Sequence, residues 1–521
     1  MIKNKFKLCI LSAGKGTRNK TIAGLHKSLL PLENKSTISH IIRSVDPTVE
    51  IVIALGYKAT QVESFIRTVF PERKIDFVYV ENYDGKGSGP GLSLLSCKRH
   101  LQCPFIFTSS DTIVEETEKL SFPKENWIGA SRVEPMQSNS YCLIKGKDAL
   151  ESLYYGDGEN AFIGIAGIHE FKEFWNSLEE FKIINGEYQV IHGFAGLCET
   201  KLKFFTWHDT GNVLSYEKTR KVYNKEIVAP KEQEAIFLEN KKVIKFFYSQ
   251  TKLQNLVLRT QFLNNCIPQI EKINNNMISY DYVEGELLSN VFDEEVLKGV
   301  LDFHLDKIAY KRFEKSDLFL QDCNQMYKAK TYSRIRKFQN TDLDKIDKIN
   351  GIKVLSVKET LDQVDWDSIN ETAIPSGFHG DFQPENIIYD GSGFKAIDWR
   401  ESFGKSLEVG DLYYDLGKLH HALLINGKMV LNKNYKYSIN NKEAFVEYYS
   451  KSNLTSLLDY FREFCQKKAL SWENVELLGY LQFITISSLY DKFHDGEYGK
   501  FLFLLGKFLL TKHLNRRKNE R

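Results

Sequence analysis

Long hydrophobic runs are what this 521-residue chain lacks most clearly. Its most apolar late segment, residues 501–510, is short and contains Lys507, so it predicts a packed helix and not a membrane span. The basic, apolar start of the chain is interrupted at Gly14-Lys15-Gly16 and has no small-residue cleavage site, unlike a signal peptide. We therefore expect no membrane insertion.

The cysteines lack any metal-binding or disulfide pattern. The chain has eight of them, with no CxxC and no paired spacing. Zinc sites and disulfide frameworks both need such spacings. We expect reduced, mostly buried thiols in a cytoplasmic protein.

An excess of one charge is also missing. Lys and Arg total 70, Asp and Glu total 68, and the signs are interspersed along the chain. A dedicated nucleic-acid binder would usually carry a basic stripe, so we expect no nucleic-acid partner. The length exceeds one ordinary domain, and a 42% hydrophobic composition is ample for two or three sizeable cores.

Residues 379–399, HGDFQPENIIYDGSGFKAIDW, carry the most specific chemistry in the chain. Asp381 is followed by Asn386 and, after an apolar run, by Asp398. One Asp can accept a proton from a substrate hydroxyl, while the Asn and the second Asp hold Mg²⁺ on nucleotide phosphates. The alternative is that Asp381 and Asn386 are ordinary turn residues. Their joint spacing with Asp398 favours catalysis.

This segment resembles the catalytic and metal loops of the aminoglycoside phosphotransferase and choline kinase family, with HGD in place of HRD and IDW in place of DFG. The segment GDLYYDLGKL (410–419) matches the same family, and we interpret Asp415 as a buried support for the loop. The resemblance implies a bilobal, kinase-like α+β domain over residues 223–521. Its N-lobe would cover about 223–285 and its C-lobe about 286–521. The pattern predicts helices over most of residues 291–372 and from Asp415 to 516. Residues 327–338 predict a basic, aromatic helix, for which a solvated face is favoured over contact with substrate.

The expected N-lobe departs from the kinase pattern in two ways. Residues 234–247 predict a hairpin with Glu239-Asn240 at its turn, and Lys245 resembles the lysine that binds the α- and β-phosphates. Tyr282 lies in the segment that would receive the adenine. However, no Gly-rich loop is visible between 223 and 240. The predicted helix at 250–264 also offers no Glu to pair with the lysine, and Gln261 is a candidate substitute.

The N-terminal segment is a second centre of chemistry. Residues 6–12 predict a buried strand, which is followed by the Gly-rich turn GKGTR (14–18). Glycines let backbone N–H groups approach phosphates closely, and Arg18 and Lys27 can neutralise their charge. The turn is neither a P-loop nor a good dinucleotide fingerprint.

The segments LSAGKGTR (11–18) and LHKSLLPL (25–32) resemble the signature of nucleotidyltransferases, with His26 where that family usually has Pro. The resemblance continues to about residue 222 and implies a Rossmann-like α/β domain over 1–222 with a mostly parallel central sheet. It implies Mg²⁺ ligands at Asp111 and Asp209, while Glu187 and Tyr188 are candidates for the acceptor pocket. The nucleotide contacts that it implies are Leu11, Ala13, Gly14, Gly16, Thr17, Asn82 and Gly89. The plainer alternative for both aspartates is a turn or strand-end residue.

A kinase makes a phosphate ester and a nucleotidyltransferase consumes one, so their fusion suggests two consecutive steps. We expect a bifunctional enzyme that phosphorylates a sugar, polyol or choline-like alcohol with ATP. It would then transfer CMP, or next in preference UMP, from CTP or UTP, giving an activated precursor for surface polysaccharide. This nucleotide preference is an analogy. The alternatives are a degenerate, regulatory kinase-like module and an antibiotic-modifying kinase. The resemblance also allows a homo-oligomer.

Overall fold

The computed structural model describes residues 5–134, 140–180, 183–184, 186–223, 232–449, 453–491 and 496–520. The chain divides into two compact units. The first comprises Met1–Ser249 and Glu271–Ser279, and the second comprises Gln250–Ile270 and Tyr280–Arg521. The division therefore falls later in the chain than the predicted boundary at 222/223, which stays a prediction.

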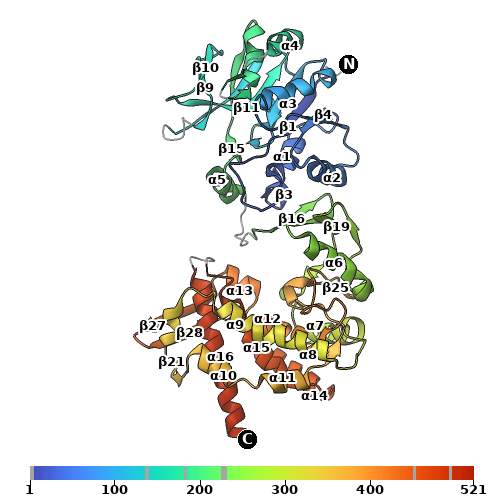
Figure 1. Ribbon diagram of the computed structural model, residues 1–521, viewed down its shortest axis with the longest axis vertical. Helices are drawn as coiled ribbons and strands as arrows, with labels where there is room; N and C mark the ends of the chain where they lie inside the picture. The colour runs from blue at the N-terminus through green and yellow to red at the C-terminus, as the bar shows by residue number, and fades with distance from the viewer. Residues whose placement is uncertain are drawn as a thin grey trace. The chain divides into compact units, whose positions relative to one another are not determined.

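A nine-stranded sheet forms the centre of the first unit within the described residues. Its path is β10-β9-β11-β6-β1-β4-β5, with β8 joined to β11 and β14 joined to β8 (Figure 1). The pairs β1–β4, β1–β6, β4–β5 and β8–β14 are parallel, whereas β11 pairs antiparallel to β6. The predicted α/β unit with a mostly parallel core is confirmed. The strands are β1 (Lys7–Ser12), β4 (Glu50–Leu55), β5 (Ile75–Tyr79), β6 (Phe105–Ser109), β8 (Trp127–Arg132), β9 (Leu143–Lys145), β10 (Ser152–Tyr154), β11 (Asn160–Ile168) and β14 (Lys201–Phe204).

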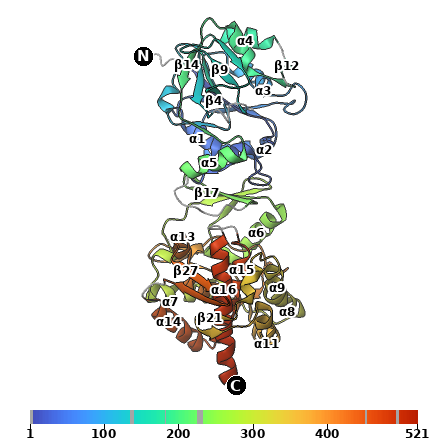
Figure 2. The ribbon, with the colours of Figure 1, turned by 90° about the vertical axis from the view of Figure 1, so that its left-hand side faces the viewer.

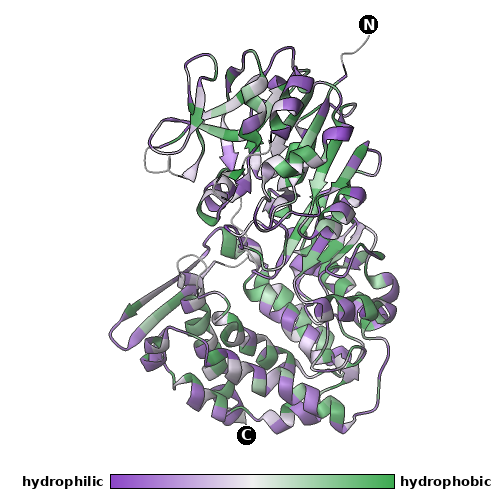
Figure 3. Ribbon diagram, turned by 45° about the horizontal axis from the view of Figure 1, so that its top comes forward, coloured by the Kyte–Doolittle hydropathy of each residue, from purple (hydrophilic) through white to green (hydrophobic). Residues whose placement is uncertain are grey.

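Helices cover both faces of this sheet because the strands are apolar on both sides. Leu8 and Ile10 of β1 belong to one core, which α1 and α2 complete. The alternate residues Cys9 and Leu11 belong to the other core, which α3 and α4 complete. Apolar colouring follows the strands at the centre of the unit (Figure 3). The helices are α1 (Thr37–Arg43), α2 (Ala59–Val69), α3 (Pro90–Ser96), α4 (Phe171–Glu179) and α5 (Val213–Tyr223) (Figure 2).

A smaller sheet has the strand order β16-β17-β19-β18. The predicted hairpin over 234–247 is confirmed, but its turn residues with positive φ are Asn240 and Lys241, one position later than predicted. Glu239 is instead the last residue of β16, and its buried carboxylate accepts hydrogen bonds from Arg43 (3.1 Å) and from the N–H of Ser36 (3.0 Å). This hairpin thus packs into the core of the first unit. The strands are β16 (Glu234–Glu239), β17 (Lys242–Phe247), β18 (Ile270–Lys272) and β19 (Met277–Asp281).

The second unit is largely helical, as predicted for residues 291–372 and for much of the chain beyond Asp415. Helix α15 packs against both α12 and α16 at its centre. The apolar segment 501–510 is part of α16 and is buried there, which confirms a packed helix. Among the residues that the structure describes, no helix combines the length and apolar character that a membrane crossing needs. The main helices are α6 (Gln250–Leu263), α7 (Glu294–Phe303), α8 (Asp317–Asn324), α9 (Lys330–Ile335), α10 (Val357–Asp362), α11 (Trp366–Thr372), α12 (Leu412–Leu424), α13 (Gly427–Leu431), α14 (Leu454–Lys467), α15 (Trp472–Ser487) and α16 (Glu497–Glu520).

The prediction of helix beyond Asp415 is wrong for one segment. Residues 435–448 form a hairpin of β27 (Tyr435–Asn440) and β28 (Glu443–Tyr448), with Asn441 at positive φ in the turn. Burial alternates along β28, where Ala444 and Val446 are buried between exposed neighbours. This period of two is the pattern of a half-buried strand, and it outweighs helical propensity here. Two short strands, β21 (Lys348–Ile349) and β22 (Ile352–Lys353), extend the sheet in the order β22-β21-β28-β27.

Candidate functional site

Strand pairing brings Asp111 and Asp209 together in the first unit. Asp111 stands between the end of β6 and the start of β7 (Thr112–Val114). The strand β15 (Trp207–Asp209) pairs antiparallel to β7 with Asp209 opposite Thr112. The N–H of Thr210 then donates to the carbonyl of Asp111 at 3.0 Å. Two residues almost a hundred positions apart in sequence thus end up side by side.

Their carboxylates face the same small space. A Cβ placed on Gly211 would lie 3.0 Å from Oδ1 of Asp209 and 3.2 Å from Oδ2 of Asp111. Burial raises the pKa of Asp209, and the neighbouring charge of Asp111 raises it further. The Tyr141 hydroxyl donates to Oδ2 of Asp209 at 3.1 Å. Two like charges held at one point form a donor set that a divalent cation such as Mg²⁺ fits.

Lys27 balances one of these charges. Its Nζ lies 2.7 Å from Oδ2 of Asp111, and both side chains are mostly buried. Burial of Asp111 favours its neutral form, but Lys27, helped by Arg18, outweighs burial and lowers the pKa of this carboxyl. Gly16 has a φ of 61°, and a Cβ there would approach Cδ of Lys27 at 2.8 Å. Only glycine therefore lets the turn pass over the lysine without strain.

The other residues of this turn that are predicted to contact the nucleotide differ in their exposure to solvent. Leu11 and Ala13 are buried at the end of β1, whereas Gly14, Thr17 and Arg18 are exposed. The sequence did not single out Asn19, which is buried and donates through Nδ2 to the carbonyl of Thr210 at 2.9 Å. Asn19 thus fastens the Gly-rich turn to the Asp209 loop. A single Asn after a polar loop carries no sequence signal for such a role.

His26 stands where the nucleotidyltransferase signature usually has Pro, and the structure shows how His fits that position. Its φ of −68° is one that proline also adopts, and its ring accepts a hydrogen bond from the N–H of Ser28. Burial lowers the pKa of His26 to about 3, so the ring is neutral and able to accept. His26 therefore caps the turn that carries Lys27.

The segment with the predicted nucleotide contacts Asn82 and Gly89 meets the predicted acceptor segment at Glu187 and Tyr188. The N–H of Tyr188 donates to the carbonyl of Ser88 at 2.8 Å. Gly89 has a φ of 135°, and a Cβ there would meet the carbonyl of Tyr188 at 2.7 Å. Asn82 and Glu187 are exposed, but the Tyr188 side chain is fully buried in the core. Of the acceptor pair, Glu187 therefore stays a candidate and Tyr188 is a packing residue.

In the second unit, Asp415 holds the predicted catalytic loop. Its carboxylate accepts hydrogen bonds from the N–H of His379 (2.6 Å), the N–H of Gly380 (2.7 Å) and Nε2 of His304 (3.0 Å). All of these groups are buried. The interpretation of Asp415 as loop support is confirmed. Burial lowers the pKa of His379 to about 4, so its neutral ring donates through Nε2 to the carbonyl of Ile397.

A tight hairpin brings Asp381, Asn386 and Asp398 together. The strands β24 (Ile387–Tyr389) and β25 (Phe394–Ala396) pair so that Ile387 lies opposite Ala396. The N–H of Ile397 donates to the carbonyl of Asn386 at 2.8 Å, which places Asp398 beside that residue. Asn386 Nδ2 donates to Oδ2 of Asp381 at 3.1 Å, which leaves its amide oxygen as the atom for a cation. Asp398 has a φ of 58°, a strained value of the kind found at functional sites.

Lys418 completes this cluster and was missed in the sequence. It lies one helical turn after Asp415 on α12, and its Nζ is 3.0 Å from Oδ1 of Asp381. Burial of Asp381 favours its neutral form, but Lys418 outweighs burial and lowers the pKa of this carboxyl. The sequence did contain a signal for Lys418: it lies three positions after Asp415 in a predicted helix, and residues three apart share one face of a helix.

Helix α6 supports the same loop through Arg259 and not through a glutamate. The buried guanidinium lies over the ring of Phe378, 3.7 Å from its centroid. It donates to the carbonyls of Leu407 (2.9 Å) and His379 (3.3 Å), and also to those of Phe378 and Arg400. Gln261, the candidate substitute for the missing Glu, is exposed. Arg259 thus fixes the backbone on both sides of the catalytic loop.

The remaining kinase residues stay predictions. Lys245 is buried in β17 opposite Ile236 and belongs to the first unit. Tyr282 is about half exposed in the second unit. The stretch in which no Gly-rich loop was visible lies partly outside the described residues, over 224–231.

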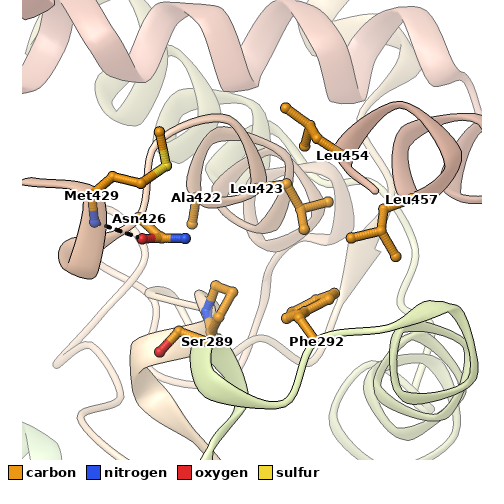
Figure 4. A pocket seen from close by; sticks show the side chains of 9 residues that line it. Ser289, Phe292, Ala422, Leu423, Asn426, Met429, Leu454 and Leu457 are labelled. Atoms are coloured by element: carbon orange, nitrogen blue, oxygen red, sulfur yellow. Dashed lines mark hydrogen bonds between the residues drawn. The ribbon is translucent and has the colours of Figure 1, made fainter. Parts of the chain in front are cut away.

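A small apolar cavity lies behind the catalytic loop (Figure 4). Pro384 lies between Asp381 and Asn386 in the chain and forms part of its wall. Asn426 also lines it, but its side-chain oxygen already accepts a hydrogen bond from the N–H of Met429. Its walls otherwise come from Ser289, Phe292, Ala422, Leu423, Met429, Leu454 and Leu457. We interpret the cavity as packing that supports the loop.

Neither site offers a metal centre made of protein ligands alone. Among the described residues, no three His, Cys, Asp or Glu side chains gather closely enough to hold a metal ion. Carboxylate pairs and an Asn–Asp pair suit Mg²⁺ instead, because this ion keeps several waters and binds substrate phosphates.

Comparisons with known proteins give similarities to the N-terminal part of the chain. No family model matches. The bifunctional protein GlmU of Methanococcus vannielii is 30% identical over 127 residues, which are 24% of this chain and 29% of that protein. The chain therefore spans less than a third of the length of this curated relative.

Solved structures give matches of low similarity. A UDP-glucose pyrophosphorylase in complex with UDP-glucose is 17% identical, with 42% of this chain and 98% of that chain covered and a TM-score of 0.37. The CTP:phosphocholine cytidylyltransferase of Streptococcus pneumoniae is 14% identical, with 42% and 100% covered and a TM-score of 0.35. Each match spans less than half of this chain.

Proposed function

We propose that this chain is a bifunctional, Mg²⁺-dependent enzyme. A kinase site at Asp381 phosphorylates a small alcohol with ATP. A nucleotidyltransferase site at Asp111 and Asp209 then transfers a nucleotidyl group to the new phosphate. One observation carries the proposal: each compact unit contains its own acidic cluster, with a lysine bound to an aspartate at 2.7 Å in one and 3.0 Å in the other.

The first site is suited to charge stabilisation. Mg²⁺ on Asp111 and Asp209 would polarise the α-phosphate of the nucleotide. Lys27 and Arg18 stabilise charge that develops on the transferred group and on pyrophosphate. The backbone of Gly14 and Gly16 can approach phosphates closely because neither has a side chain. The acceptor phosphate is itself the nucleophile, so this site needs no general base.

The second site is suited to activating a hydroxyl group. Asp381 stays ionised because Lys418 lowers its pKa, so it can accept the proton of the alcohol. The amide oxygen of Asn386 and the carboxylate of Asp398 would hold Mg²⁺ on the ATP phosphates. Asp415 and Arg259 keep the loop rigid, which preserves the position of Asp381.

The finer parts of the proposal rest on resemblance. We propose domain limits at 1–222 and 223–521, with Lys245 and Tyr282 in the ATP site. CTP is the preferred donor and UTP the next, by analogy with the choline pathway. The product would be a nucleoside-diphosphate-activated precursor for surface polysaccharide. The GlmU match and the pyrophosphorylase and cytidylyltransferase matches support the nucleotidyltransferase half only.

A rival function is favoured by one observation. Helix α6 has no Glu for the phosphate-binding lysine, and its buried cation Arg259 serves the loop instead. The kinase-like unit could then be a regulatory module that binds Mg-ATP without turnover. The ion pair between Asp381 and Lys418 favours the enzyme, because a binding module needs no poised base.

The test is a ³¹P NMR screen of the full chain with Mg²⁺. ATP and either CTP or UTP are incubated with a panel of unphosphorylated alcohols and with their phosphate esters. We expect a diphosphodiester from an unphosphorylated acceptor. Product from the phosphate esters alone would support the rival.

A further inference from the structure

Four cationic side chains gather around the Tyr414 phenol in the second unit, and three of them also interact with the proposed general base, Asp381. Lys418 comes from α12, Arg400 follows the metal loop, and Lys330 and Arg334 come from α9. The positive charges of Lys418 and Arg400 act on Asp381, and the Asp381 charge in turn acts on Arg334. All four are only partly exposed. The sequence had favoured a solvated face for residues 327–338, which is wrong for Lys330 and Arg334.

Local structure fixes these cations in place. Lys330 and Arg334 are four residues apart, so they lie on one face of α9. The preceding turn is a π-helix over Gln325–Ala329, a form often found at functional sites. Within it, the buried hydroxyl of Tyr327 donates to Oδ2 of Asp411 at 2.6 Å, and Asp411 is the N-cap of α12. This bond holds the segment leading into α9 against the start of the helix that carries Lys418.

In the part of the chain that the structure describes, an ion pair with a carboxylate accounts for one of these four positive charges. Within the part of the chain that the structure describes, no carboxylate forms an ion pair with Lys330, Arg334 or Arg400, and the partner of Lys418 is Asp381 itself. Lys330 donates to the hydroxyl of Tyr414 at 3.0 Å. In the same described part, the guanidinium of Arg334 has no hydrogen-bond partner.

Burial and the neighbouring cations act against the charged forms of Lys330 and Arg334, whereas nearby negative groups raise the pKa of Lys418 and of Arg400. Glu401 and Asp381 are the carboxylates that act on the four cations, together with the phenol of Tyr414. Burial, together with the neighbouring cations Arg400, Arg334 and Lys418, lowers the pKa of Lys330 to about 8. Partly buried like charges repel one another unless an anion joins them. The cluster is thus arranged for an anion that binds from outside.

We propose that the acceptor of the kinase site is an alcohol that also carries an oxyanion, either a carboxylate or a phosphate, and that Arg334, Lys330 and Arg400 bind this anion beside Asp381. The inference rests on the proposed kinase function and specifies its substrate class. A guanidinium suits either oxyanion, because its parallel N–H groups match both. Amino alcohols and aminoglycosides are positively charged, so this site would repel them.

The competing role for these cations is binding of the ATP phosphates. In the proposed kinase site, the charge of the ATP phosphates is neutralised by Mg²⁺ on Asn386 and Asp398. These two residues flank the hairpin of β24 and β25 next to Asp381. Lys330 and Arg334 come from a different element, α9. Since the acceptor hydroxyl must reach Asp381, an anion on the same small molecule comes within reach of the cations around that residue. The two roles predict changes in different KM values.

The first experiment measures ADP release by the full chain with Mg-ATP and matched acceptors. Glycerol is the neutral probe, glycerate the carboxylate, glycerol 3-phosphate the phosphate and ethanolamine the cation. Glucose, gluconate and glucose 6-phosphate form a larger set. We expect kcat/KM for the preferred anionic form to exceed that of its neutral partner by about tenfold or more. The carboxylate and phosphate members identify the oxyanion.

Turnover of the neutral or cationic members at a similar or higher rate would overturn the inference while leaving the kinase function intact. Absence of ADP release from every member would contradict the kinase function itself. The two failures are therefore distinguishable.

The second experiment uses Arg334→Gln. We expect the KM of the anionic acceptor to rise by about tenfold or more, with the KM for ATP unchanged. Arg334→Lys keeps the charge and should recover part of the loss. Arg336→Gln is the matched control, because Arg336 is exposed two positions later. A rise in the KM for ATP, with acceptor KM unchanged, would assign the cations to the nucleotide and contradict the inference.

Discussion

The ammonium of Lys418 lies 3.0 Å from Oδ1 of Asp381, which belongs to the loop that Asp415 fastens, whereas Lys418 itself lies on α12. Asp415 and Lys418 share one face of α12. One helix thus positions the loop backbone through Asp415 and keeps the general base ionised through Lys418. Any change in that helix should affect phosphorylation and leave nucleotidyl transfer alone.

Lys418→Met removes the charge and keeps most of the side-chain volume. We expect kcat for phosphorylation to fall by about a hundredfold, because a buried Asp381 loses the cation that keeps it ionised and oriented. Steady-state kinetics of both activities measures this. Lys467→Met is the control, since Lys467 is an exposed helix lysine. An unchanged kinase rate in Lys418→Met would mean that the ion pair has no part in catalysis.

Asp415→Ala tests the support of the catalytic loop. The change leaves the N–H groups of His379 and Gly380 buried without an acceptor, at a cost of about 1–3 kcal/mol for each group. We expect a lower unfolding temperature of the full chain and loss of phosphorylation, with nucleotidyl transfer retained. Calorimetry and both activity assays check this. Parental kinase activity in this variant would show that the loop keeps its shape without Asp415.

Gly211→Ala tests the metal site of the first unit. The added methyl would lie 3.0 Å from Asp209 and 3.2 Å from Asp111, in the space between their carboxylates. We expect nucleotidyl transfer to fall by about a hundredfold, since both carboxylates must reach the same ion. Gly393→Ala is the matched control, because a methyl there would meet nothing within 4 Å. Equal transfer rates in the two variants would place the metal elsewhere.

Ionisation of the Tyr414 phenol should make the binding of an anionic acceptor depend on pH. Burial alone would raise the pKa of Tyr414, but Lys330, Arg400 and Lys418 outweigh burial and lower it to about 7. The phenol is neutral below this pH and becomes a phenolate above it, which offsets the cationic cluster. The KM of an anionic acceptor should therefore rise from about pH 6 to about pH 8, with loss of the Lys330 proton adding to the trend at the upper end.

Tyr414→Phe removes the titrating group and should flatten this rise below about pH 7.5. The measurement is the acceptor KM at saturating ATP across that range for both proteins. A parental KM that is independent of pH, or one that falls as pH rises, would be inconsistent with the assigned charges.

Local patterns in the sequence predicted the parts of the structure that depend on local spacing. Asn386 and Asp398 flank one short hairpin and Asp381 comes five residues before Asn386, so their separation along the chain almost fixes their separation in space. The short apolar run at residues 6–12 likewise predicted a buried strand, and the structure shows that alternate residues of β1 belong to the cores on its two faces. The hairpin at 435–448 was missed because its strands are short and its alternation is half polar.

The rest depends on contacts between distant segments, which one sequence does not reveal. Arg259 and Asn19 fasten loops that lie more than a hundred residues away. Lys330 and Arg334 stand among many basic residues, and nothing in that pattern separates a solvated face from a cation cluster beside a carboxylate. Only the fold brings α9 and α12 together around Asp381.

The central claim is that one chain carries two independent active sites, and paired variants test it most directly. Asp381→Asn and Asp111→Asn are each supplied with Mg²⁺, ATP, CTP and the acceptor found in the screen, and ³¹P NMR follows both phosphate ester and diphosphodiester. We predict that Asp381→Asn makes no ester but still converts added ester to diphosphodiester, while Asp111→Asn accumulates the ester. Loss of both activities in either folded variant would contradict the account.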